Sequence, residues 1–161
     1  MALTKVIGSG IGTVTNQFAV GNMAAGSIIQ VVNFVTTSEV STTGTTFIDA
    51  GVSTSITPSS TSSKILVLYT LHQFINASQG ESKVKLLRGS TDLLETGYLV
   101  YNGGSSAMAQ GTHHYLDSPS TTSSTTYKVQ FNSVDGSSVF CTYDDSAGNA
   151  SSFMTLLEIA Q

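Results

Sequence analysis

Three histidines are the first side chains in this sequence that could bind a metal ion or act in catalysis. His113 and His114 are adjacent, and His72 stands apart from them. Neighbouring residues of a strand point to opposite faces, so His113 and His114 cannot chelate one ion within one chain. In a trimer, one of them could meet its copies around the symmetry axis. We expect ordinary hydrogen-bonding histidines here, with His72 partly buried at an interface.

Two other groups could carry chemistry. Asp144, Asp145 and Asn149 could offer oxygen atoms to Ca²⁺, but their spacing is not that of a twelve-residue calcium loop. We expect a solvated turn there. Cys141 lies among apolar residues without a nearby histidine or cation, which predicts an inert thiol in the core. The sequence therefore predicts neither a metal site nor a cofactor.

Catalytic patterns are missing from the sequence. It contains no Gly-x-Ser-x-Gly nucleophile elbow, although hydroxyl side chains are abundant. Its glutamates, Glu39, Glu81, Glu95 and Glu158, are isolated from one another, so no pair of carboxylates suggests a glycosidase. We expect a protein that is not an enzyme.

The composition restricts the partners. The chain has 161 residues, a net charge of −4 and only 6 Lys and Arg, which removes the electrostatic basis for binding nucleic acid. No run approaches the roughly 18 apolar residues of a spanning helix, so we expect no membrane insertion. Charged residues make up 10% of the chain, whereas Ser and Thr supply 47 residues. The polar surface is therefore built from small neutral hydroxyls, which suits a chain that buries much of its surface against copies of itself.

Short apolar runs rich in β-branched residues follow one another along the chain, separated by clusters of turn-forming residues. Nine of them predict strands. They cover Ser27–Thr36, Thr46–Ile56, Lys64–Ile75, Ser82–Arg88, Asp92–Tyr101, Ala107–Leu116, Thr125–Ser133, Ser137–Tyr143 and Phe153–Ile159. This succession predicts an all-β fold, an antiparallel sandwich or a barrel.

The connections have their own signatures. Residues 37–46 are rich in Ser and Thr and predict a loop. Asp135-Gly136 predicts a two-residue hairpin turn between the strands on either side of it. Two connectors that begin at Pro58 and Pro119 and continue with Ser and Thr predict a pair of matched Greek-key-like crossings.

Two strands are apolar on nearly both faces. They are Lys64–Tyr69 and Phe153–Ile159. A sandwich strand of this kind needs, besides the core on one face, a second neighbour that shields its other face from water. This neighbour is either a loop of the same chain or another subunit, and the sequence leaves both possibilities open. For the subunit alternative, the predicted trimer interface consists of Leu66, Leu68, His72, Met154 and Leu156.

The segment before residue 26 does not follow the strand pattern. It is apolar, is interrupted by several glycines and has too few residues to form a hydrophobic core of its own. We divide the chain into an attachment arm, residues 1–25, and a head domain, residues 26–161; the alternative is that the arm is a first edge strand of the sandwich. The predicted attachment residues are Leu3, Val6, Ile7, Ile11, Val14 and Phe18.

Several stretches of the chain resemble the globular head domains of tailed-bacteriophage fibre and virion-surface proteins. The resemblance lies in Ala25–Val32, Ile56–Val67, Tyr115–Pro119 continuing to Thr126–Gln130, and the closing Leu156–Gln161. It implies a jelly-roll-like head that assembles as a homotrimer. It also implies a place on the virion after assembly in the host cytoplasm.

Two functions are compatible with this resemblance. The first is a short structural fibre or capsid decoration, in which the arm docks on a capsid or tail protein and the head projects outward. The second is a receptor-binding tail-fibre head that recognises a host surface glycan or protein through Tyr98, Tyr101, Asn102 and His113.

Overall fold

The computed structural model describes residues 23–77, 80–101, 104–143 and 150–161, and every regular element in these ranges is a strand. Ten strands follow one another: β1 (Ile28–Thr36), β2 (Val40–Thr42), β3 (Ile48–Ile56), β4 (Lys64–Asn76), β5 (Glu81–Arg88), β6 (Thr91–Tyr101), β7 (Ala107–Asp117), β8 (Thr125–Ser133), β9 (Ser138–Cys141) and β10 (Ser152–Ile159). All nine predicted strands are confirmed. The tenth, β2, lies inside residues 37–46, so the prediction of a loop holds for residues 37–39 and 43–46 and was wrong for residues 40–42.

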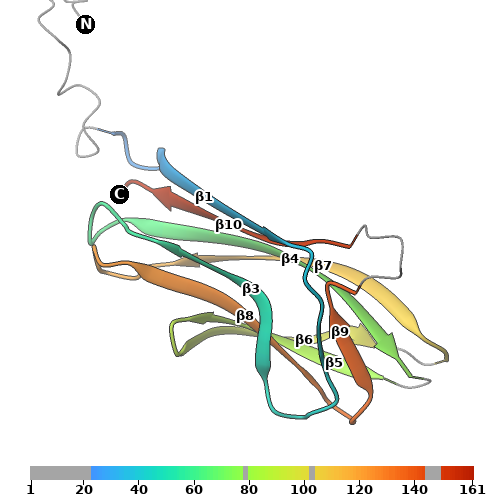
Figure 1. Ribbon diagram of the computed structural model, residues 1–161. Coiled ribbons are helices and arrows are strands. Elements are labelled where there is room, and N and C mark those ends of the chain that lie inside the picture. Colours follow the sequence, from blue (N-terminus) through green and yellow to red (C-terminus); the bar gives the residue numbers. More distant parts are fainter. Residues whose placement is uncertain (1–22, 78–79, 102–103, 144–149) are drawn as a thin grey trace, which may run out of the picture.

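The strands form two antiparallel sheets that pack face to face, as Figure 1 shows. The larger sheet has the order β1-β10-β4-β9-β2, and β7 pairs with β4 outside this path. The smaller sheet has the order β3-β8-β5-β6. Most connections between consecutive strands pass from one sheet to the other, as in a jelly roll. The predicted all-β, jelly-roll-like antiparallel sandwich is confirmed.

The core between the sheets is built from alternate residues of the central strands. Along β4, the odd-numbered residues from Ile65 to Ile75 are fully buried, whereas the even-numbered ones point to the opposite face. This period of two is what an extended backbone imposes on its side chains. The largest apolar side chains of the core are Ile56, Ile65, Tyr69, Leu71, Ile75, Leu86, Tyr127, Phe131, Met154 and Leu156.

Strand β4 organises the larger sheet because it changes partner along its length. On one side it pairs with β7 from Ile65 to Ile75. On the other side its first half pairs with β10 and its last four residues pair with β9. The sheet therefore forks near His72, whose backbone N–H donates to Ser152 Oγ at 3.1 Å and whose carbonyl accepts from Thr142 N–H at 2.7 Å.

The two connectors that begin at prolines cross between the sheets as predicted. The connector at Pro58 leads from β3 in the smaller sheet to β4 in the larger, and the connector at Pro119 leads from β7 to β8. The first is held in place by Glu158, which is buried and accepts hydrogen bonds from the N–H and the hydroxyl of Ser59 at 2.7 and 2.6 Å.

The hairpin prediction at Asp135-Gly136 was wrong. The turn itself forms, with Gly136 at φ 88°, and Asp135 accepts from the N–H and hydroxyl of Ser137. However, β8 and β9 belong to different sheets, so the turn joins the two layers and not two paired strands. A turn motif specifies a local reversal of the chain, whereas the pairing partner is decided by which faces the flanking strands bury.

Candidate functional site

The outer face of the larger sheet carries a continuous apolar row. Val31, Leu157, Leu66 and Leu116 lie side by side across β1, β10, β4 and β7, because each is the register partner of the next. The two ends of the row are the most accessible, with Val31 58% and Leu116 49% exposed. Contiguous apolar surface, when it is extensive, often marks a site where a protein associates with a partner.

The next two rows continue the face without a charged residue, and Lys64 lies one row beyond Leu66 in the other direction. The two rows run in the same strand order: Asn33, Thr155, Leu68 and His114, then Val35, Phe153, Thr70 and Thr112. Their polar groups bond to one another: Thr155 Oγ1 donates to Asn33 Oδ1 at 2.9 Å, and the hydroxyls of Thr70 and Thr112 are 2.8 Å apart. None of the residues in the three rows is charged. We call these three rows the neutral face.

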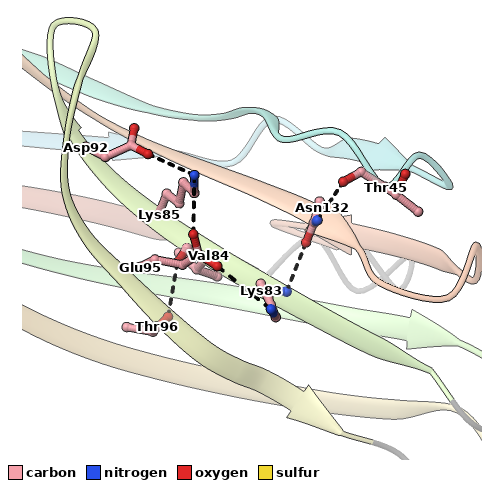
Figure 2. Close-up of polar contacts among 8 residues, drawn as sticks. All are labelled: Thr45, Lys83, Val84, Lys85, Asp92, Glu95, Thr96 and Asn132. Atoms are coloured by element: carbon pink, nitrogen blue, oxygen red, sulfur yellow. Dashed lines mark hydrogen bonds and ion pairs between the residues drawn. The ribbon is translucent and has the colours of Figure 1, made fainter.

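The outer face of the smaller sheet has the opposite character. Lys85 on β5 lies between Asp92 and Glu95 of β6, with Nζ to carboxylate distances of 2.8 and 3.3 Å, as Figure 2 shows. Lys128 on β8 pairs with Asp49 on β3 at 2.9 Å. Asp92 and Glu95 are the carboxylates that the structure brings together around one cation, but they lie on an exposed strand face and not in a cleft.

The carboxylate of Asp49 illustrates how the charges on the outer face of the smaller sheet are paired. Partial burial by itself raises its pKa, but hydrogen bonds from Gln130 Nε2 at 2.7 Å and from Lys128 outweigh this effect. The pKa of Asp49 is therefore held below its ordinary value. A side chain amide and a backbone N–H add to the network: Asn132 donates to the carbonyl of Thr45 at 2.8 Å and accepts from Lys83 N–H at 3.3 Å (Figure 2). This face is a solvated surface with its charges matched.

The predicted trimer-interface residues divide between the two sides of the larger sheet. Leu66, Leu68 and His72 lie on its outer side, as an interface requires. Met154 and Leu156 point into the core and are fully buried within the single chain, so they are not accessible to a second chain and we withdraw them. The outward residues of β10 are Phe153, Thr155 and Leu157, which the alternation of a strand places on the other side.

His113 and His114 do point to opposite faces, as predicted. His114 is exposed in the neutral face, whereas His113 points inward and its ring stacks on Tyr69 with centroids 5.3 Å apart. Burial, and secondarily the nearby His114, lowers the pKa of His113. Because His113 lies in β7 with its ring turned to the core, it is withdrawn as a receptor-loop residue.

The remaining candidate receptor residues are only partly described. Tyr98 and Tyr101 belong to β6, but their side chains, like all of Asn102, lie outside the described residues. The same holds for the predicted attachment residues Leu3, Val6, Ile7, Ile11, Val14 and Phe18, and for Asp144, Asp145 and Asn149.

The described ranges contain no group of side chains that could hold a metal ion. Among these residues, no three His, Cys, Asp or Glu side chains come together as a ligand set. Cys141 is buried; Gln73 Nε2 donates to its sulfur at 3.2 Å, and burial raises the pKa of the thiol to about 12. This is the environment of an unreactive core cysteine. Asp117 is likewise structural, since it accepts two hydrogen bonds from Arg88 and one from Tyr127.

At its β2 end, the larger sheet carries a hollow that the sequence did not predict. It has a volume of about 280 Å³ and lies over β2 and β9. Its lining consists of Ser41, Thr42, Thr43, Ser138 and Phe140. The sequence does not predict this hollow because β2 is only three residues long and consists mostly of hydroxyl residues, which are more typical of a loop.

Compared with family models and with curated proteins, the chain matches none. Across the described ranges, the fold contains no helix with the length and apolar character needed to span a bilayer. The contrast between the two outer faces is therefore the strongest functional signal in the molecule.

Proposed function

We propose that this chain is a structural protein of a bacteriophage virion surface, a homotrimer whose residues 1–25 dock on a capsid or tail protein and whose sandwich projects outward. The observation that carries the assembly is the neutral face, which extends over four strands while the opposite sheet face bears paired charges. A place on the virion is supported by the resemblance of several stretches between residues 25 and 161 to phage head domains.

The physical basis of the assembly is the removal of aliphatic surface from water. Each Å² of apolar surface buried contributes roughly 25 cal/mol, so the side chains of the neutral face favour association. No Asp, Glu, Lys or Arg side chain in its three rows has to be desolvated when two copies meet. The hydroxyls of Thr70 and Thr112 already bond to each other, and that of Thr155 bonds to the amide oxygen of Asn33. Contacts of this kind resemble obligate interfaces between identical subunits.

Sedimentation equilibrium of the full chain tests the assembly. We expect the wild type to be a trimer and Leu157→Lys to be a folded monomer, because the substitution places a charge in the middle of the neutral face. Ser90→Lys is the matched control, since it adds the same charge at an exposed turn between β5 and β6. A wild type that sediments as a monomer, or a Leu157→Lys protein that remains fully trimeric, contradicts the proposal.

A deletion of residues 1–25 tests the attachment arm separately. The shortened chain should remain trimeric but no longer bind to virions that lack this protein. If the shortened chain decorates such virions as well as the full chain does, the arm has no part in docking.

A further inference from the structure

The hollow over β2 and β9 combines two kinds of surface. In the register of these strands, Ser41 lies opposite Phe140 and Thr42 opposite Val139. Ser41, Thr42, Thr43 and Ser138 are small hydroxyl residues, whereas Phe140 is large and aromatic. We call Phe140 the aromatic wall of the hollow and the four hydroxyl residues its hydroxyl floor.

The aromatic wall is held rigidly. The Phe140 ring meets Tyr143 edge to face with centroids 5.3 Å apart, and it meets Phe74 at 5.7 Å. Phe74 and Tyr143 themselves stack at 4.1 Å. A ring fixed by two aromatic neighbours loses little conformational freedom when a ligand packs against it, which favours binding.

The hydroxyl floor is available for hydrogen bonding. Thr42 Oγ1 accepts from Gly44 N–H at 3.0 Å and is thereby fixed in place. Within the described part of the chain, the hydroxyls of Ser41, Thr43 and Ser138 have no side-chain hydrogen bond, so each can both donate and accept. Among the described residues that line the hollow, none is charged.

These features select the chemical class of the ligand. A carboxylate or phosphate group would need a cation for charge-assisted hydrogen bonds, and the five described lining residues include none. A purely apolar ligand would leave three hydroxyls without water or partners. A neutral sugar satisfies both surfaces, because the C–H face of its ring packs on Phe140 while its hydroxyls exchange hydrogen bonds with Ser41, Thr43 and Ser138.

We propose that the hollow over β2 and β9 binds one ring of a neutral saccharide. Its volume of about 280 Å³ lies at the lower limit of ligand pockets, roughly 300 Å³, which suits a single ring and not a long oligosaccharide. The site is built from one chain and lies at the opposite end of β4 from the β10 pairing, so it does not rest on the proposed assembly. A single open site of this kind binds weakly, and several copies on one particle raise the apparent affinity through avidity.

Saturation-transfer NMR of the full chain tests the site. The probes are the methyl glycosides of glucose, galactose, mannose and N-acetylglucosamine, with N-acetylneuraminic acid and glucose 6-phosphate as charged comparisons. We expect at least one neutral glycoside to bind and the charged sugars to bind more weakly. Binding of none of the neutral glycosides, or equal binding of the charged sugars, overturns the proposal.

Two variants connect binding to the hollow. Ser138→Trp fills the floor and leaves Phe140 in place, whereas Phe140→Leu removes the aromatic wall; each should weaken binding by about tenfold or more. Ser90→Trp, on an exposed turn of the other sheet, is the matched control and should bind like the wild type. If Ser138→Trp binds the neutral glycoside as well as the wild type does, the proposed site is wrong. Sedimentation of the same variant should show unaltered assembly, so that failure of the sugar site and failure of the trimer are distinguished.

Discussion

Leu66 of β4 lies directly opposite Leu157 of β10, and both side chains point away from the core. One residue earlier in β10, Leu156 lies opposite Val67 and is fully buried. Adjacent leucines of one strand therefore belong to two different apolar surfaces. One surface stabilises the single chain, and the other is accessible to a partner.

Replacing each leucine by alanine separates these two roles. Leu156→Ala should lower the free energy of unfolding by about 2–5 kcal/mol, because it leaves a cavity in the core. Leu157→Ala should instead weaken association, so that the midpoint of urea unfolding depends less on protein concentration than in the wild type. Urea titrations at several protein concentrations measure both effects. Equal losses in the two variants, at all concentrations, would show that Leu157 has no role beyond the fold.

Tyr69 and Tyr127 provide a second matched pair. Both are buried core residues, but the hydroxyl of Tyr127 donates to Asp117 Oδ2 at 2.6 Å, whereas the buried hydroxyl of Tyr69 has no hydrogen-bond partner among the described residues. Tyr127→Phe should lower the free energy of unfolding by about 1.5–3 kcal/mol, since it removes a bond to a charged group. Tyr69→Phe should raise it by about 1 kcal/mol, since an unpaired polar group leaves the core. Chemical denaturation of both variants checks the opposite signs; destabilisation by Tyr69→Phe would contradict the prediction.

The strands and their class could be predicted from the sequence because the signal is local. Runs of β-branched residues bounded by turn residues placed nine strands, and the two proline connectors correctly indicated crossings between layers. The pairing of strands is not local, which is why the Asp135-Gly136 turn was mistaken for a hairpin. Strand β2 was missed because its pairing with β9 depends on tertiary contact and not on its own composition.

The candidate site was harder to predict than the fold. In β10, Phe153, Met154, Leu156 and Leu157 are all apolar, so the alternation that normally assigns residues to the core or to the surface is absent. The sequence could indicate that both faces of this strand are shielded from water. It could not tell which residues face the core and which face outward. The hollow over β2 and β9 was unpredictable for a similar reason, since it needs the register of a strand that was not expected.

The buried chain of Ser82, Gln73 and Cys141 should behave as a coupled unit. Ser82 Oγ donates to Gln73 Oε1 at 2.8 Å, and Gln73 Nε2 donates to the sulfur of Cys141. Gln73→Leu leaves the Ser82 hydroxyl buried without a partner, so it should lower the free energy of unfolding by about 1–3 kcal/mol.

A double-mutant cycle measures the coupling. Gln73→Leu combined with Ser82→Ala should be less destabilising than the sum of the single substitutions, by about 1 kcal/mol, because the partner left unpaired has also been removed. Urea unfolding of the four proteins provides the cycle. Strict additivity would show that the Ser82 to Gln73 hydrogen bond contributes nothing to stability.

Alkaline pH should unfold the protein through buried groups of the core, among them Tyr69, Cys141 and Tyr127, since burial raises the pKa of all three. Burial raises the pKa of Tyr69 from 10.0 to about 12 and the pKa of the Cys141 thiol from 9.0 to about 12, the latter despite the hydrogen bond from Gln73. The unfolded chain releases these protons near their ordinary pKa values, while the folded chain retains them up to about pH 12. The unfolded state therefore binds fewer protons in this window, and raising the pH favours unfolding.

The stability that these two groups contribute is fully present below pH 9 and is lost progressively as the pH rises from 9 towards 12. Urea unfolding at a series of pH values measures the slope, and Tyr69→Phe should make it shallower above pH 10 because one of the linked protons no longer takes part, while those of Cys141 and Tyr127 still do. Cys141 should also react with a thiol reagent only at the rate of unfolding, since the buried thiol does not ionise below that range. A stability that stays constant between pH 9 and 12, or a thiol that reacts at once in the folded protein, would mean that the inward faces of β4 and β9 are not as dry as their packing indicates.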